Sequence, residues 1–254
     1  MDQVDIELNE KVYEFMEITR HDRISTSAQK REKPPPPGSW DLPAEEIFSL
    51  TEPGDIEAPE TDLLRSMKKR RSRRSFTERP LDIDEISLLL YYTQGIKREL
   101  PEEKSLRTVP SAGARHGFET LLYLHRGKDL PRGIYHYRAR EHSLALLEEG
   151  DFSREMIRAA LEQNHVGGAA AVFIWAADAR RMAWRYSERA FRYLHLDAGH
   201  VCQNLYLAAE AINAGVCAIA AYDDDYINDL LDLNGEDKFV IYMAEVGSRR
   251  KMKD

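Results

Sequence analysis

A dense cluster of positive charge in an acidic chain is the feature that most limits how this sequence can fold. Seven of its 36 lysines and arginines fall within residues 65–74, whereas the 254-residue chain as a whole carries 44 acidic residues and a formal net charge of −8. Charges of one sign at this density repel one another unless an anion lies against them. We therefore expect the fold to present this stretch to an anionic ligand.

The spacing within the cluster suits a compact anion. Arg70, Ser72 and Arg74 are two residues apart, so an extended turn after a helix would place two guanidinium groups and a hydroxyl on one side. Arginine binds phosphate oxygens through paired hydrogen bonds, each contributing about 1.5–3 kcal/mol. A solvated basic face is one alternative. Contact with nucleic acid is another, although a pI near 5.6 argues against nucleic acid as the main partner. The other basic side chains of the run are expected to be solvated or paired with acidic groups, namely Lys68, Lys69 and Arg73.

Composition places the chain among globular proteins. Hydrophobic residues make up 43% and aromatic residues 9% of the sequence, enough for a sizeable core in one large domain or in one domain with an extension. The acidic N-terminus lacks the features of a signal peptide, and the longest uncharged apolar run, residues 166–177, is too short to span a bilayer. The two cysteines, Cys202 and Cys217, suit buried positions in a reducing compartment better than a disulfide framework. We expect a cytoplasmic protein with no membrane partner.

Prolines set the first 60 residues apart. Seven of the eleven prolines lie between Pro34 and Pro59, and proline fixes φ and cannot donate a backbone hydrogen bond. We therefore divide the chain into a proline-rich N-terminal extension, residues 1–60, and a main domain, residues 61–254. The extension is expected to wrap over the main domain after a short helix near residues 7–19, and a disordered leader is the alternative.

Periodic patterns predict a mixture of helices and strands in the main domain. Asp82 and Glu85 form a capping-box pattern for a helix that ends at Gly95, and Thr61 is expected to cap the helix before the basic cluster. Further helices are expected over residues 154–163, 183–214 and 223–231. Strands are expected over residues 119–125, 133–137, 143–147, 169–177, 216–222 and 239–246. Because the elements mix without regular βαβ alternation, the pattern favours an α+β fold over a doubly wound one.

Several common active-site patterns are missing from the sequence. It contains neither the GxGxxG pattern of dinucleotide-binding folds nor the GxxxxGKS/T pattern of nucleoside triphosphatases. His195 and His200, five residues apart on an expected helix, point about 140° apart, which disfavours a shared metal ion. A Ser/His/Asp triad stays open, although no GxSxG elbow supports one. We expect no metal site.

Several segments, taken together in order, resemble the nitroreductase family of flavin mononucleotide (FMN) enzymes. Residues 70–76, RRSRRSF, resemble the RRSxRxF motif that opens the family. The other similar segments are residues 91–96, 110–116, 185–205 and 218–225. Within the family, the chain resembles the SagB-type dehydrogenases, which oxidise azolines to thiazoles and oxazoles in modified peptides. The resemblance covers residues 61–247 and implies an α+β, nitroreductase-like fold, with a mostly antiparallel central sheet flanked by helices and an intertwined homodimer that binds FMN at its interface.

The resemblance also implies roles for single residues. Arg70, Ser72 and Arg71 would hold the flavin phosphate and ribityl chain, and Arg74 would place a cation near the pyrimidine edge of the ring. The remaining expected cofactor contacts are Pro110, Ser111 and Gly113 from the partner subunit, the backbone of Ala220 and Ala221, and the side chains of Arg249 and Arg250. Relatives usually carry glycines at the two alanine positions, so this sequence departs from the family pattern there.

Arg185 and Tyr186 match a Lys-Tyr pair of the azoline-oxidising branch. A neighbouring cation favours the phenolate form of a tyrosine, which a general base that removes a ring proton requires. Arginine can supply that charge but cannot itself act as the base at neutral pH. Packing of Tyr186 at a helix start is the alternative interpretation.

The leading hypothesis is therefore a homodimeric FMN-dependent oxidoreductase that takes hydride from an azoline-like or other small heterocyclic or peptidic substrate. An NAD(P)H-dependent nitro or quinone reductase is the alternative among enzymes, with NAD(P)H as the electron donor. A non-catalytic flavin-binding partner in a peptide-modifying complex is the alternative from another class, and the proline-rich extension would suit its docking. Loops near residues 96–108 and 179–187 are expected to cover the flavin and set specificity.

Overall fold

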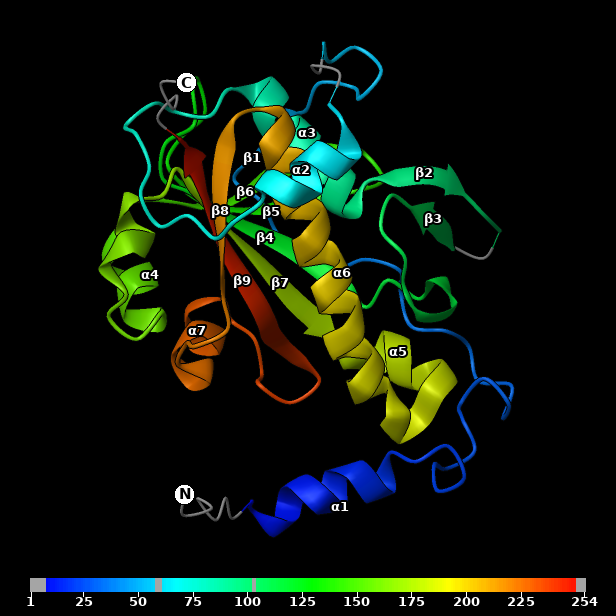
Figure 1. Ribbon diagram of the computed structural model, residues 1–254. Coiled ribbons are helices and arrows are strands. Elements are labelled where there is room, and N and C mark those ends of the chain that lie inside the picture. The colour runs from blue at the N-terminus through cyan, green and yellow to red at the C-terminus, as the bar shows by residue number, and fades with distance from the viewer. Residues whose placement is uncertain (1–7, 58–60, 102–103, 250–254) are drawn as a thin grey trace.

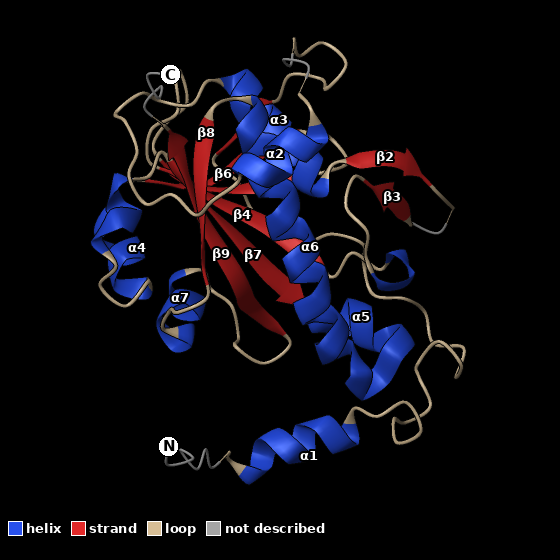
Figure 2. Ribbon diagram, viewed as in Figure 1, coloured by secondary structure: helices blue, strands red, loops and turns tan. Residues whose placement is uncertain are grey.

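A seven-stranded sheet forms the centre of the molecule, and helices cover both of its faces (Figures 1 and 2). The computed structural model describes residues 8–57, 61–101 and 104–249. The strand order is β1-β6-β5-β4-β7-β9-β8, and every neighbouring pair in this sheet is antiparallel. The predicted α+β fold, with an antiparallel central sheet flanked by helices, is confirmed.

The predicted strands of the main domain are all present, within a few residues of their expected bounds. The strands of the sheet are β1 (Glu46–Ser49), β4 (Phe118–Leu124), β5 (Gly133–Arg138), β6 (Ser143–Glu149), β7 (Ala171–Asp178), β8 (Ala214–Ile219) and β9 (Lys238–Ser248). A separate hairpin consists of β2 (Ile96–Glu99) and β3 (Ser105–Arg107). The α-helices are α1 (Glu10–Ile18), α2 (Leu63–Lys69), α3 (Ile83–Gln94), α4 (Ser153–Ala159), α5 (Ala179–Tyr186), α6 (Ala190–Ala211) and α7 (Asp224–Leu230).

Alternating side chains place a hydrophobic layer on each face of the sheet. All of β7 is buried, with Phe173 and Trp175 in the layer that contains α3 and α6. Val172 and Ile174 belong to the other layer, which contains residues of α4 and α7. Burial on both faces explains why this strand is a continuous apolar run in the sequence. The two layers hold α6 against one face and α4 and α7 against the other (Figure 2).

Two helix starts test the capping patterns in the sequence. At α3, the Asp82 side chain accepts a hydrogen bond from Glu85 N and the Glu85 side chain accepts one from Asp82 N, so the predicted capping box is confirmed. At α2, the cap is Asp62, whose carboxylate accepts a hydrogen bond from Arg65 N. The expectation of Thr61 as the cap is therefore wrong by one residue.

The single long helix expected over residues 183–214 is instead two helices. Tyr186 ends α5, Ser187 has a positive φ of 50°, and α6 begins after a short 3₁₀ turn. The N-terminal extension holds this break, because Ser187 Oγ donates to Ser25 O and Ser25 donates to the Glu188 carboxylate. These partners lie far away in the sequence, so helical periodicity alone cannot reveal the break. The break leaves Tyr186 at the end of a helix.

The proline-rich extension lies across the main domain, as expected. Four hydrogen bonds anchor a segment that we call the strap, residues 33–41. Trp184 Nε1 donates to Lys33 O at 2.8 Å, and Trp40 N donates to the buried Glu119 carboxylate at 2.9 Å. Further along, strand β1 joins the edge of the main sheet by pairing with β6.

Three smaller expectations have mixed outcomes. Residues 96–108, expected to be a loop over the flavin, contain the β2-β3 hairpin, and residues 179–187, expected to be a second such loop, contain helix α5 instead. Cys202 and Cys217 are free and buried, as expected. Among the described residues, no helix has the length and apolar character needed to cross a membrane.

Candidate functional site

The basic cluster leaves α2 in an extended conformation and runs beside β8. Arg70 forms the C-terminal cap of α2. Ser72 forms a parallel bridge with Val216 of β8, and Arg73 N donates to Val216 O at 2.8 Å. Because residues of extended backbone point alternately to opposite sides, the basic side chains separate into two groups.

The first group lies against α6 and β8. The Arg70 guanidinium lies 5.1 Å from the centroid of the Tyr206 ring, and the hydroxyl oxygens of Ser72 and Tyr206 are 3.0 Å apart. Ala218 N donates to the same tyrosine hydroxyl at 2.9 Å. Tyr206 thus fixes two residues of the cluster. The sequence does not reveal this role of Tyr206, because its position in the helix resembles an ordinary core position.

The second group contains Arg73 and Arg249. Burial and the nearby charges of Arg249 and Arg71 lower the pKa of Arg73, and its buried Nε has no hydrogen-bond partner among the described residues. Arg249 donates to the Glu210 carboxylate at 2.9 Å, so protein groups already engage this expected phosphate contact. Arg73 is half-buried rather than solvated. Arg250, the other expected contact at this end of the chain, lies outside the described residues.

The first group has the properties of an anion site. The described part of the chain supplies no ion-pair partner to Arg70 or Arg74 of this group, nor to Arg71 between them, and both Arg71 and Arg74 are exposed. Ala220 and Ala221 follow β8 and are also exposed, and within the described residues their backbone N–H groups donate no hydrogen bond. Uncompensated guanidinium groups, a hydroxyl and free amides beside one strand suit a phosphate-bearing flavin. These residues therefore fit FMN.

The expected flavin-contacting loop, residues 110–116, packs against the candidate catalytic pair. Gly113 has a φ of +56°, and a methyl group at its Cα would lie 2.3 Å from the Tyr186 hydroxyl and 3.2 Å from Arg185 Nε. Only glycine combines this backbone conformation with so close an approach. Pro110 is exposed beside it. The structure thus places the expected flavin-contacting loop next to the candidate catalytic pair within one chain.

Hydrogen bonds to α6 and within the loop hold this segment in place. Ala112 N donates to the Asp197 carboxylate at 3.1 Å, and His116 N donates to Ser111 Oγ at 2.9 Å. Burial raises the pKa of Asp197, although its bonds to the loop oppose this rise. Asp197 and Tyr206 both lie on α6, and their spacing along the helix corresponds to about 14 Å. One helix therefore supports both halves of the candidate site.

Arg185 and Tyr186 remain open to a ligand. The Tyr186 ring meets the Tyr193 ring edge-on with centroids 4.7 Å apart, and the Arg185 guanidinium lies 5.6 Å from the Tyr186 centroid. Arg185 is exposed, and the Tyr186 hydroxyl has no hydrogen-bond partner in the described part of the chain. Tyr186 also contacts the hydrophobic core. The ring of Tyr186 therefore packs against the core, as one interpretation expected, while its hydroxyl stays available for chemistry.

The histidine of the loop makes folding sensitive to acid. Burial and the nearby Arg107 charge lower the pKa of His116 to about 3, whereas a histidine in an unfolded chain titrates at about 6.5. Between these values the unfolded chain binds a proton that the folded chain does not, so the free energy of unfolding falls as pH drops from 6.5 toward 3. This group alone contributes up to about 1.4 kcal/mol per pH unit. We expect His116→Gln to flatten the dependence of stability on pH, measured by urea denaturation between pH 7 and 4. An unchanged slope would contradict this assignment.

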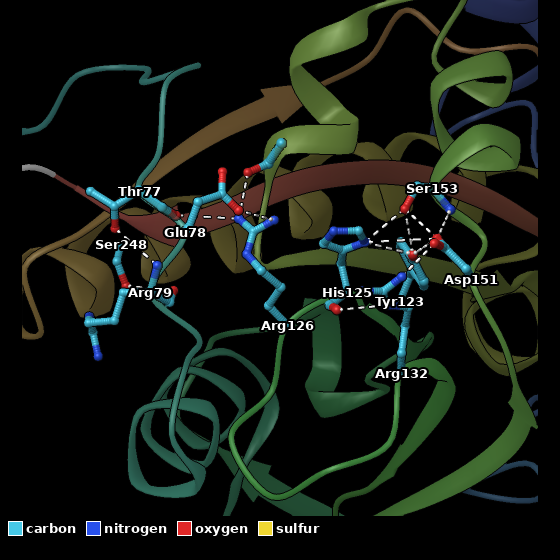
Figure 3. A network of polar contacts seen from close by, with 11 residues as sticks. Thr77, Glu78, Arg79, Tyr123, His125, Arg126, Arg132, Asp151, Ser153 and Ser248 are labelled. Carbon is cyan, nitrogen blue, oxygen red and sulfur yellow. Dashed lines mark hydrogen bonds and ion pairs between the residues drawn. The ribbon is translucent and has the colours of Figure 1, made fainter.

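A second polar cluster lies at the far end of β4 and resembles a hydrolytic triad. Figure 3 shows Tyr123, His125, Asp151 and Ser153 directed toward one another. Both Ser153 Oγ and the Tyr123 hydroxyl contact the same ring nitrogen, His125 Nδ1, at 2.7 and 3.0 Å, and Asp151 lies on this side too. A proton relay needs the serine and the carboxylate on opposite ring nitrogens. Asp151 instead accepts a hydrogen bond from Ser153 N at the start of α4.

Within the described residues, no group of three or more metal-binding side chains could hold a metal ion.

Comparisons with known proteins identify the family and the fold of this chain. Residues 67–248 match the sequence pattern of the Nitroreductase family. MJ1384 of Methanocaldococcus jannaschii, a protein named as a nitroreductase, is 32% identical over 181 residues, which cover 71% of this chain and 88% of that protein. The trifolitoxin operon protein TfxC of Rhizobium leguminosarum bv. trifolii is 27% identical over 198 residues, which cover 73% of this chain but only 55% of TfxC.

Solved structures show the same fold. A chain of the E. coli microcin synthetase McbBCD complex with truncated pro-MccB17 bound has a TM-score of 0.60 and 17% identity, covering 96% of this chain and 95% of that one. A nitroreductase from Desulfovibrio desulfuricans in complex with FMN has a TM-score of 0.51 and 17% identity, covering 77% of this chain and 94% of that one. The family match begins within the basic cluster and ends with β9, and on this basis the protein belongs to the Nitroreductase family of oxidoreductases.

Proposed function

We propose that the protein is an FMN-dependent dehydrogenase of the SagB type, which oxidises an azoline-like or other small heterocyclic or peptidic substrate. The observation that carries the proposal is the basic cluster beside β8, whose guanidinium groups at Arg70, Arg71 and Arg74 have no ion-pair partner in the described residues. The FMN complex of a structural neighbour agrees with this choice of cofactor. FMN, when bound, supplies the hydride-accepting chemistry.

The residues of the basic cluster divide the binding task. Arg70, Ser72 and Arg71 would hold the phosphate and ribityl chain, since two of them already surround the Tyr206 ring and hydroxyl. Arg74 would place its charge at the pyrimidine edge of the ring. The exposed amides that follow β8 would donate hydrogen bonds to the ring.

A second copy of the chain would complete the site. The loop around Gly113 and the pair Arg185-Tyr186 form the other half, supported by the opposite end of α6. Apolar side chains are exposed on α2 and α6, including Leu64 at 75% and Leu196 at 61%. Such side chains suit burial in an isologous dimer, in which the Gly113 loop of one subunit reaches the cluster of the other. Arg249 and Arg250 remain predicted contributors to the phosphate site.

Tyr186 is the proposed proton acceptor. Its hydroxyl has no partner in the described residues, and the Arg185 guanidinium lies 5.6 Å from the centroid of its ring. Gly113 leaves the space in which that hydroxyl lies. The similarity to TfxC and to a chain of a microcin synthetase complex supports a peptidic substrate and assembly with other subunits.

Anaerobic mixing of the FMN-loaded protein with a thiazoline-containing peptide tests this function. We expect bleaching of the flavin absorbance and a product that lacks two hydrogens by mass spectrometry. Tyr186→Phe should slow bleaching by at least about 100-fold without weakening FMN binding, because general-base catalysis typically contributes factors of that size. Tyr193→Phe, which changes the neighbouring ring, serves as the matched control. Equal rates for the wild type and Tyr186→Phe would contradict the assigned role.

A nitro or quinone reductase is the second candidate, favoured by the name of MJ1384. Rapid anaerobic bleaching by NADH or NADPH would support this candidate. Bleaching by the thiazoline peptide but not by either nucleotide would support the dehydrogenase.

A further inference from the structure

The main sheet opens into a fork at one end of β4 and β5. These strands pair with each other only as far as Leu121 and His136. Beyond that point, residues 118–120 pair with β7 and residues 137–138 pair with β6, so the two strands diverge. A cavity of about 220 Å³, which we call the fork cavity, lies in this opening. Residues 38–41 of the strap line its outer side.

Three residues of the cavity wall carry buried polar atoms that have no hydrogen-bond partner within the described part of the chain. They are Thr120 Oγ1, His136 Nδ1 and Arg107 Nε. Thr120 is 2% exposed and His136 is 1% exposed, so bulk water does not reach these side chains. Buried polar atoms nearly always have a hydrogen-bond partner in folded proteins. Three unmet atoms around one cavity therefore point to a polar ligand within it.

The charge of the wall shows which kind of ligand fits. Arg107 Nη1 donates to Gln94 Oε1 at 3.0 Å, and in the described part of the chain this guanidinium has no other hydrogen bond and no carboxylate at ion-pairing distance. Glu119, the buried carboxylate of the wall, is already bound by Arg181 and His136. Although burial lowers the pKa of Arg107 to about 10, the group stays charged at neutral pH. Arg107 is half-buried, and a partly desolvated charge without a carboxylate partner favours a counter-ion beside it.

We propose that the fork cavity binds a small organic carboxylate, which accepts hydrogen bonds from the free edge of the Arg107 guanidinium and from Thr120. A planar guanidinium edge matches the two oxygens of a carboxylate. The cavity is smaller than the roughly 300–1,000 Å³ of sites for drug-sized ligands, so a compact molecule fits.

This carboxylate site is separate from the FMN residues but borders the Gly113 loop. None of the residues assigned to FMN or to catalysis lines the fork cavity. Ser105 does line it, and its carbonyl oxygen lies 3.1 Å from Nε2 of His116, the last residue of the loop. Arg107 also lines a neighbouring cavity of about 380 Å³ that extends to Arg115. Because the FMN and catalytic residues do not line the fork cavity, carboxylate binding there can be measured without bound FMN and without enzyme turnover.

Calorimetric titration of the full-length protein with sodium acetate, butyrate, benzoate and phosphate at constant ionic strength tests the proposal. We expect saturable binding of at least one of the carboxylates, with one site per chain. Arg107→Gln should weaken that binding by at least about tenfold, the usual effect of losing a charge-assisted hydrogen bond. Lys128→Gln, the same charge change at an exposed position, should leave it unchanged. Thr120→Val, which keeps the shape of the side chain, should weaken carboxylate binding less than Arg107→Gln does. If Arg107→Gln does not fold, Thr120→Val provides the test instead.

Three results would overturn the proposal. The first is the absence of saturable carboxylate binding to the wild type, and the second is saturation by phosphate alone. The third is equal affinity of the wild type and both cavity variants. A purely structural role for Arg107 predicts that Arg107→Gln melts at a lower temperature and that no carboxylate raises the melting temperature of the wild type. Our proposal instead predicts that the bound carboxylate raises the melting temperature of the wild type but not that of Arg107→Gln.

Discussion

Alanine at both Arg70 and Arg74 is expected to weaken FMN binding by at least about 100-fold. Each charge-assisted hydrogen bond contributes about 1.5–3 kcal/mol, and the double variant removes both guanidinium groups. In the described part of the chain neither side chain has a carboxylate to neutralise it, so a bound anion receives the full interaction. Titration of FMN fluorescence with each protein measures the affinities directly.

The control for this prediction lies in the same stretch of chain. Lys68 and Lys69 are exposed in the last turn of α2, so alanine at both removes the same formal charge without touching the extended part of the cluster. We expect this pair to change affinity by less than about threefold, as is typical of screened surface charges. Equal losses in the two double variants would mean that only the general charge matters. Full affinity of the Arg70/Arg74 variant would place the flavin elsewhere.

Alanine at Gly113 is expected to lower the free energy of unfolding by about 2–4 kcal/mol, since it combines two unfavourable effects. The backbone has a φ of +56°, which a residue with a Cβ adopts only at a cost. The new methyl group would also lie 2.3 Å from the Tyr186 hydroxyl and force one of the two groups to move. Urea denaturation monitored by circular dichroism gives the stability of the variant.

A double-mutant cycle separates these two effects. In a Tyr186→Phe background the hydroxyl is absent, so Gly113→Ala should cost less than it does in the wild type, leaving mainly the backbone term. Gly168→Ala is the matched control, because no heavy atom lies within 4 Å of the methyl group that it adds. The same cost for Gly113→Ala in both backgrounds would show that the loop does not rest on Tyr186.

Much of the fold can be read from the sequence because its signals are local. The capping box of Asp82 and Glu85 depends on atoms within one helical turn, and the residues confirm it. Strand β7 is apolar along its whole length because both of its faces are buried. Such features need no knowledge of distant parts of the chain.

The elements that sequence analysis missed depend on distant partners. Ser187 breaks the long helix because Ser25, far away in the chain, binds this turn. Strand β1 forms by pairing with β6, and its short, exposed sequence has little periodicity of its own. Thr61 and Asp62 are both good caps, and only the backbone path selects the second.

In the candidate site too, local features could be predicted from the sequence and contacts between distant segments could not. The alternation of Arg70, Ser72 and Arg74 follows from extended backbone and could be predicted. The role of Tyr206, which joins this group to β8, could not, because a tyrosine in a helical stripe gives no sign of what its hydroxyl meets. The contact between Gly113 and Tyr186 likewise joins segments that are distant in the sequence.

The central claim is that the basic cluster holds a flavin, and the visible absorbance spectrum of the purified protein tests it most directly. The full-length protein is mixed with FMN, freed of unbound flavin by gel filtration and measured for flavin and protein content. We expect flavin absorbance bands that stay with the protein at one FMN per chain. A colourless protein that retains no added FMN would contradict the account.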